Sequence, residues 1–169
     1  RLLQVINKED ATVAAAVAKA IPEIEKTIKL IVPRLKKGGR LFYLGAGTSG
    51  RLGCVDASEM PPTYGVAPTL VQGIMAGGFE ALIKSREGAE DDGALGRKDI
   101  SSRKIGKRDV VIGISASGRA RYVSEALLEA RRRGAATSCI TCNRNSVLIP
   151  CADVAIVADT GPEVVTGST

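Results

Sequence analysis

The chain has 169 residues, 44% hydrophobic and 25% charged, a balance that fits one folded domain and excludes an intrinsically disordered chain. It has no His, which excludes Ser-His-Asp and Cys-His catalysis and His-ligated metals, and with 3% aromatics and no Trp it lacks base-stacking surfaces. The formal net charge of +6 leaves two classes of partner open, an anionic substrate or a nucleic acid.

The first segment, residues 1–38, is expected to be helical. Apolar residues recur every three or four positions from Ile21 to Leu35, which places them in one stripe along a helix. Pro22 is acceptable in a first helical turn, and Gly38-Gly39 stops the helix.

Residues 39–169 alternate between strand-like and helix-like stretches. Five short apolar runs have the pattern of strands that are buried on both faces: Leu41–Leu44, Leu70–Met75, Val110–Ile114, Thr137–Thr141 and Val154–Val157. Helix-like stretches such as Tyr122–Arg133 lie between most of them. This alternation predicts a single α/β domain over residues 1–169, a three-layer α/β/α sandwich with a mainly parallel five-stranded sheet.

The loops after the strands are the first candidates for a site, because ligands of open parallel sheets bind beyond the carboxyl ends of the strands. Gly45–Gly50 follows the first strand, Ala76–Gly78 the second and Ser115–Gly118 the third. Glycines allow close backbone approach, and helix amino termini offer free N–H groups to an anion. We therefore expect a phosphate site that uses Gly47, Thr48, Ser49, Gly50, Ser115, Ser117 and Gly118. Glycine-rich turns with helix-capping hydroxyls remain the alternative.

Two nucleotide motifs fit the first loop only in part. Gly45, Gly47 and Gly50 match the dinucleotide fingerprint, but Val66–Gly78 contains no acidic residue to bind a ribose. The same loop resembles a P-loop, but Arg51-Leu52 stands where Lys and a hydroxyl residue are required. Both nucleotide sites are therefore excluded, and a simpler phosphate site remains.

Two acidic segments, Asp56–Glu59 and Glu87–Asp92, could carry chemistry. Most such clusters are exposed helix caps. Two carboxylates beside a phosphate site could instead act as a general base and a general acid, if their surroundings keep them in opposite protonation states. The residues alone leave both alternatives open.

The cysteines and the apolar runs indicate the cellular compartment of the protein. Cys54, Cys139, Cys142 and Cys151 show no disulfide spacing, and the Cys139–Cys142 pair lies in an apolar strand-like run. We expect reduced core thiols in a cytoplasmic protein. No apolar run approaches the roughly 20 residues that a membrane span needs, and no signal peptide is visible, so no membrane partner is expected.

Four segments together resemble a known family. They are Gly39–Gly53, Asp56–Glu59 with Pro61–Gly65, Glu87–Asp91 and Gly161–Thr169. These are similar to the N-acetylmuramic acid 6-phosphate etherases, which belong to the sugar isomerase (SIS) domain superfamily. The similar segments are long, stand in the same order and extend over nearly the whole chain.

The resemblance implies cleavage of the D-lactyl ether of N-acetylmuramic acid 6-phosphate, giving N-acetylglucosamine 6-phosphate and D-lactate. It implies a homodimer in the bacterial cytoplasm that needs no metal or cofactor. It also implies two catalytic glutamates, Glu59 as the proton donor and Glu90, and adds Glu163 to the substrate-binding residues. We assign removal of the C2 proton to Glu90 and protonation of the departing lactate oxygen to Glu59.

Helix geometry adds an expectation for Glu59. If Ser49–Glu59 is one continuous helix, its rise places Glu59 about 15 Å from the phosphate end, too far to reach C3 of the same sugar. Either the helix breaks before Glu59, or Glu59 serves the pocket of a partner subunit. We favour the shared site.

Three features depart from the family pattern, one of them Met60, which replaces the usual Cys after Glu59. Ala120-Arg121 stands where the family has Thr-Pro beside the phosphate loop, and the chain stops at Thr169 where the family continues, so we expect a C-terminal truncation. The alternative function is a non-catalytic sugar-phosphate-binding regulator that resembles glucokinase regulatory protein. No helix-turn-helix or basic-aromatic motif supports a nucleic-acid partner.

Overall fold

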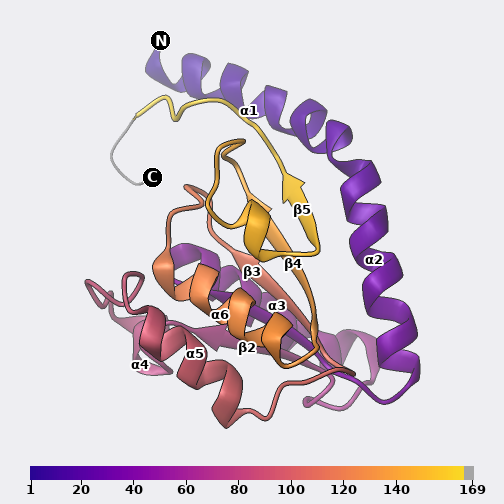
Figure 1. Ribbon diagram of the computed structural model, residues 1–169. Helices are drawn as coiled ribbons and strands as arrows, with labels where there is room; N and C mark the ends of the chain where they lie inside the picture. The colour runs from indigo at the N-terminus through magenta and orange to yellow at the C-terminus, as the bar shows by residue number, and fades with distance from the viewer. Residues whose placement is uncertain (166–169) are drawn as a thin grey trace.

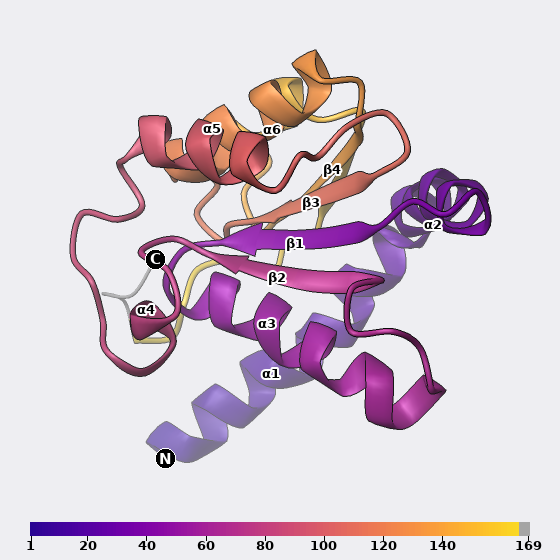
Figure 2. The same ribbon diagram turned by 90° about the horizontal axis from the view of Figure 1, so that it is seen from below.

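The computed structural model describes residues 1–165 and shows a five-stranded parallel sheet between two layers of helices (Figure 1, Figure 2). The strands are β1 (Leu41–Gly45), β2 (Val71–Met75), β3 (Val110–Ile114), β4 (Ala136–Thr141) and β5 (Val154–Val157), in the order β2-β1-β3-β4-β5. Every neighbouring pair is parallel. The end of the Gly161–Thr169 motif, residues 166–169, lies outside the described residues.

The helices connect these strands across both faces of the sheet. They are α1 (Leu2–Lys19), α2 (Ile21–Lys36), α3 (Gly47–Tyr64), α4 (Glu80–Ile83), α5 (Gly93–Ser102) and α6 (Arg121–Arg132), with a 3₁₀ turn, η1, at Ile149–Cys151. In Figure 2, α5 and α6 lie on one side of the strands and α3 lies on the other. The predicted three-layer α/β/α sandwich is confirmed.

Each face of the sheet has its own hydrophobic core because successive side chains of a strand point to opposite faces. In β1, Phe42 and Leu44 pack with side chains of α5 and α6, and both are fully buried. Leu41 and Tyr43 belong to the opposite core, with side chains of α2 and α3. The central strands are therefore apolar on both faces, as their uninterrupted sequence runs predicted.

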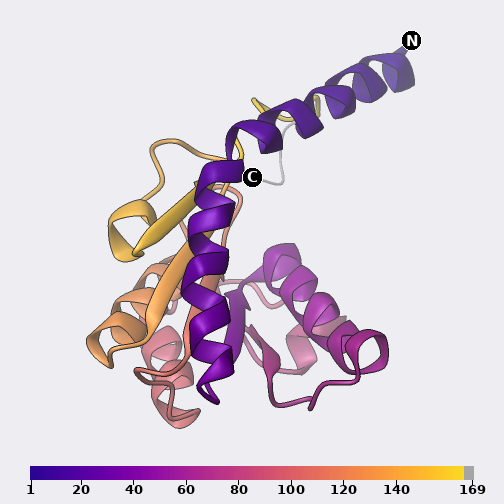
Figure 3. The same ribbon diagram turned by 90° about the vertical axis from the view of Figure 1, so that its right-hand side faces the viewer.

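The predicted N-terminal helical segment forms two helices that meet at Ala20. Helix α2 lies along the sheet, where the Thr27 hydroxyl is 3.0 Å from the buried Ser138 hydroxyl of β4. Helix α1 extends away from the sheet (Figure 3), and most of its side chains are exposed.

Candidate functional site

A cavity of about 340 Å³ lies where β1 and β3 end. The chain leaves β1 toward β2 at one edge and passes from β3 toward β4 and β5 at the other, so this is the topological switch point of the sheet. We call it the switch-point cavity; it is lined by Ala46, Gly47, Thr48, Ser49, Leu52, Glu90, Ile114, Ser115, Ala116, Ser117, Ala120 and Glu163. The structure thus brings together most of the residues that the sequence indicated, from four separate segments of the chain.

The β1–α3 loop forms one wall of the cavity. Gly47 has φ +55°, a left-handed conformation that favours glycine. Gly50 is buried and does not line the cavity: a Cβ there would lie 2.4 Å from the Gly45 carbonyl oxygen, so Gly50 allows α3 to approach β1. No side chain among the described residues caps the amino terminus of α3. Its first N–H groups and its positive dipole end therefore face the cavity, where an anion would be stabilised.

The β3–α6 loop forms the opposite wall. The buried Ser115 hydroxyl accepts a hydrogen bond from the Gly118 amide at 3.2 Å. Gly118 has φ +68°, and a Cβ there would lie 2.1 Å from the Ser146 Oγ, which donates to the Gly118 carbonyl oxygen at 3.1 Å. Gly118 therefore packs against Ser146 and fixes the conformation of this loop, and it does not line the cavity. The Ser117 side chain lines the cavity.

Residues after β4 support this loop, and they were not predicted from the sequence. The Asn143 side-chain amide donates to the Ser117 carbonyl oxygen at 2.9 Å, and the Cys142 amide donates to the Ala116 carbonyl oxygen at 3.0 Å. The available signal was position: polar residues that directly follow a strand next to β3 lie at the same edge of a parallel sheet.

Glu90 reaches the cavity from the segment between α4 and α5. Its main-chain carbonyl oxygen accepts a hydrogen bond from the Tyr122 amide at 2.8 Å, in the first turn of α6. The fully buried Tyr122 donates its hydroxyl to Asp99 of α5 at 2.6 Å, and burial together with that carboxylate raises the pKa of Tyr122. The contact between α5 and α6 therefore fixes the backbone of Glu90 at the cavity.

Glu59 lies outside the cavity. Helix α3 is continuous from Gly47 to Tyr64, although Pro61 and Pro62 fall within its last turn, and Glu59 is exposed on it. The expectation that the helix could break before Glu59 is therefore wrong. Within this chain the structure does not bring Glu59 and Glu90 together at one cavity.

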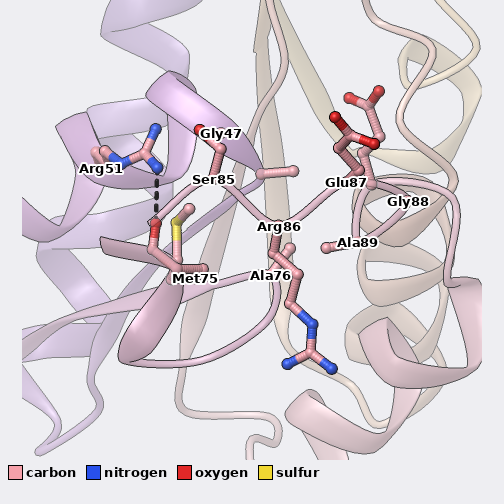
Figure 4. A pocket seen from close by; sticks show the side chains of 12 residues that line it. Gly47, Arg51, Met75, Ala76, Ser85, Arg86, Glu87, Gly88 and Ala89 are labelled. Atoms are coloured by element: carbon pink, nitrogen blue, oxygen red, sulfur yellow. Dashed lines mark hydrogen bonds between the residues drawn. The ribbon is translucent and has the colours of Figure 1, made fainter. Parts of the chain in front are cut away.

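A smaller cavity of about 190 Å³ adjoins the first one and shares Ala46, Gly47 and Glu90 with it. We call it the arginine cavity, because Arg51 and Arg86 contribute to its wall (Figure 4). Its other lining residues are Met75, Ala76, Ala81, Ser85, Glu87, Gly88 and Ala89. Of the three loops that follow β1, β2 and β3, the loop after β2 thus contributes Ala76 to this cavity rather than to the switch-point cavity.

The described lining of the switch-point cavity contains no basic side chain. Among the described residues that line the switch-point cavity, the charged side chains are those of Glu90 and Glu163. In residues 1–165, no group of three or more His, Cys, Asp or Glu side chains is placed to hold a metal ion. An anion in the switch-point cavity would therefore depend on main-chain N–H groups and on the Thr48, Ser49 and Ser117 hydroxyls.

The four cysteines differ in how deeply they are buried. Cys139 and Cys151 are buried, Cys54 is partly buried and Cys142 is exposed, and all four are free thiols. Cys142 therefore differs from the expected core thiol. No helix in residues 1–165 has the length and apolar character of a membrane span.

Comparisons with known proteins agree with this architecture. A model of the glucokinase regulatory protein N-terminal SIS domain matches residues 23–130, and a SIS domain model matches residues 98–169. A phosphoheptose isomerase structure from Francisella tularensis superposes with a TM-score of 0.74 over 94% of this chain and 86% of its own, at 18% sequence identity. At that identity, the likeness concerns the fold.

Curated relatives are more similar in sequence. The chain is 55% identical over 168 residues to an N-acetylmuramic acid 6-phosphate etherase of Symbiobacterium thermophilum, covering 99% of this chain and 56% of the relative. It is also 55% identical over 167 residues to an etherase of the same name from Bacteroides thetaiotaomicron, covering 99% of this chain and 60% of that relative. The chain thus spans little more than half the length of these relatives. It belongs to the family of the glucokinase regulatory protein N-terminal SIS domain, and its resemblance to the N-acetylmuramic acid 6-phosphate etherases is confirmed.

Proposed function

We propose that this chain forms the sugar-phosphate-binding SIS domain, residues 1–169, of an N-acetylmuramic acid 6-phosphate etherase. The enzyme would act in the bacterial cytoplasm during recycling of cell-wall amino sugars. One observation carries the proposal: the two hydroxyl-bearing loops, Glu90 and Glu163 line a single cavity at the switch point of the sheet. The sequence identity of 55% to proteins of that name supports the same activity.

In this proposal the 6-phosphate binds at the amino terminus of α3. The free N–H groups of that helix and the hydroxyls of Thr48, Ser49 and Ser117 would hold it, with Ser115 and Gly118 fixing the shape of the second loop. The phosphate then orients the sugar without taking part in bond breaking.

The chemistry requires an acid and a base. In the ring-opened sugar, the C2 proton lies next to the C1 carbonyl, so the Glu90 carboxylate can remove it. The electron pair forms a C2–C3 double bond while the C3–O bond to lactate breaks. Glu59 protonates the departing lactate oxygen, and water adds to the double bond to give N-acetylglucosamine 6-phosphate. No nucleophile on the protein is needed.

The position of Glu59 supports a homodimer with shared active sites. Because α3 continues past Glu59, the carboxyl of Glu59 lies far along the helix from the phosphate end of the same chain. The partner subunit's Glu59 would therefore complete each site. Exposed apolar side chains on α3, Leu52 and Val55, lie on the same helix as Glu59 and would be covered by the partner.

A non-catalytic regulator is not favoured. The regulatory-protein model describes the shared SIS domain, whereas the relatives cited above are named etherases. A sugar-phosphate sensor also has no need for an acid and a base, and this chain has Glu59 and Glu90 in the segments that resemble the etherases.

The test is D-lactate release from N-acetylmuramic acid 6-phosphate by the full-length protein. We expect release by the wild type and a loss of at least about 100-fold in kcat for Glu90→Gln, because a general base contributes about that much. Glu80→Gln, an exposed carboxylate on α4 outside both cavities, is the matched control and should retain activity. Tight sugar-phosphate binding by the wild type without lactate release would instead favour the regulator.

A further inference from the structure

The arginine cavity is not yet assigned to any part of the substrate. It adjoins the switch-point cavity, and Glu90 lines both. A ligand that fills the switch-point cavity and has a substituent extending past Glu90 would therefore place that substituent in the arginine cavity.

The charges around the site indicate which chemical group this substituent carries. The described lining of the switch-point cavity contains no Lys or Arg, and the same holds for the cavity of about 320 Å³ beside Ser117, Asn143 and Glu163. The arginine cavity, in contrast, is lined by Arg51 and Arg86, together with Glu87 and Glu90. A carboxylate on the ligand is best matched there, because a guanidinium binds a carboxylate through two parallel hydrogen bonds.

The two arginines differ in how fully they are engaged. Arg51 donates to the carbonyl oxygens of Leu82 at 3.0 Å and Ala81 at 2.8 Å, so it holds the end of α4 against α3. Arg86 is exposed and makes one long hydrogen bond, 3.4 Å, to the Gly77 carbonyl oxygen. Most of its five N–H donors therefore remain available for a ligand.

We propose that the arginine cavity is the subsite for the ether substituent and that Arg86 binds the lactyl carboxylate. This inference rests on the proposed function. The substrate has its phosphate on C6 and its carboxylate on the C3 substituent, and the reacting C2 and C3 atoms lie between these ends. A phosphate at α3 and a carboxylate at Arg86 would hold C2 and C3 beside Glu90, which lies between the two cavities.

The test uses two ligands that differ by the lactyl group. In the full-length protein, Arg86→Gln should raise the KM for N-acetylmuramic acid 6-phosphate about tenfold, the effect of losing a charge-assisted hydrogen bond. Its Kd for N-acetylglucosamine 6-phosphate, which has no carboxylate, should stay unchanged by calorimetry. Arg86→Lys keeps the charge, and its KM for N-acetylmuramic acid 6-phosphate should lie between the values of the wild type and of Arg86→Gln. Lys84→Gln, which removes an exposed cation nearby that lines neither cavity, should match the wild type.

Two results would overturn the inference. If Arg86→Gln weakened the binding of both ligands equally, Arg86 would bind the phosphate. If the KM and the Kd were both unchanged, Arg86 would bind neither group. Failure of the proposed function is recognised separately, because the wild-type protein would then release no lactate at all. Because Arg86 is exposed, we expect the Arg86 variants to keep the wild-type melting temperature.

Discussion

At the scale of single residues, Asp109 carries the most heavily hydrogen-bonded carboxylate in the described chain. It accepts hydrogen bonds from the Arg40 amide at 3.0 Å, from the Arg40 guanidinium at 3.1 and 2.9 Å, and from the Gly106 amide at 3.0 Å. Burial by itself would raise the pKa of Asp109, but these hydrogen bonds and the Arg40 charge outweigh burial and lower it. Asp109 thus joins the amino ends of β1 and β3, away from the site.

This lowered pKa predicts a pH dependence of stability. Since the folded state has the lower pKa, the stabilisation is complete above the unfolded pKa of about 3.9 and is lost as the pH falls through the folded value. Asp109→Asn should lower the free energy of unfolding by about 3 kcal/mol at pH 7 and should flatten its acid dependence. Urea denaturation at pH 7 and pH 3 measures both, with the exposed Asp10→Asn as control. An unchanged pH dependence in Asp109→Asn would contradict this assignment.

The cysteines should differ in reactivity because only thiolates react readily. Burial, and to a lesser extent the neighbouring Cys151, raises the pKa of Cys139 to about 11, whereas Cys142 is exposed. Alkylation of the native protein at pH 8, followed by peptide mass spectrometry, should label Cys142 first and Cys139 last. Labelling in urea should abolish the difference. If Cys139 reacted as fast as Cys142 in the native state, its burial would be disproved.

At the scale of elements, the crossing of α5 and α6 controls where Glu90 lies. The helices approach closely at Gly96, where a Cβ would lie 2.3 Å from the Tyr122 carbonyl oxygen. The amide of the same Tyr122 donates to the Glu90 carbonyl oxygen. A change at Gly96 therefore acts on the position of Glu90 without touching the cavity.

Gly96→Ala should consequently lower both stability and activity. Alanine gains about 1 kcal/mol of helix propensity, but overlap with a backbone atom costs about 1–3 kcal/mol, so we expect a net loss of about 1 kcal/mol. We also expect kcat to fall, because α6 and the Glu90 backbone are displaced together. Ser101→Ala, at an exposed position of α5, should show neither effect. Thermal unfolding and D-lactate assays on the full-length variants measure both; a fully stable and active Gly96→Ala would show that the crossing is adaptable.

Some elements could be predicted from the sequence and others could not. The strands were placed to within about one residue, because central parallel strands are buried on both faces and form continuous apolar runs. Helix α5 was not identified: Gly93 and Gly96 lower its helix propensity, and contacts with α6 stabilise it instead. The two phosphate-loop candidates were found from local motifs. The approach of Glu90 to the cavity, and the role of Asn143, depend on contacts distant in sequence that no local pattern encodes.

At the scale of the whole molecule, the shared-site proposal makes a quantitative prediction. Glu59→Gln and Glu90→Gln chains are each expected to be inactive alone. In a mixed dimer, one site would combine an intact Glu90 with the partner subunit's Glu59, and the other site would lack both. Random reassociation of equal amounts should therefore restore about a quarter of the wild-type activity. A sample that contains only one of the two variants is the control. No recovery despite proven subunit exchange would contradict sharing.

The hydroxyl contact between Thr27 and Ser138 has a consequence for α1. Sliding α2 by one helical turn, about 5.4 Å, would separate these buried hydroxyls and leave the Ser138 hydroxyl without this hydrogen bond in an apolar layer. Apolar side chains alone would tolerate such a slide better, because their contacts are not directional. The contact therefore selects one axial register for α2. Since α1 joins α2 at Ala20, the same contact also determines the point from which α1 extends away from the sheet.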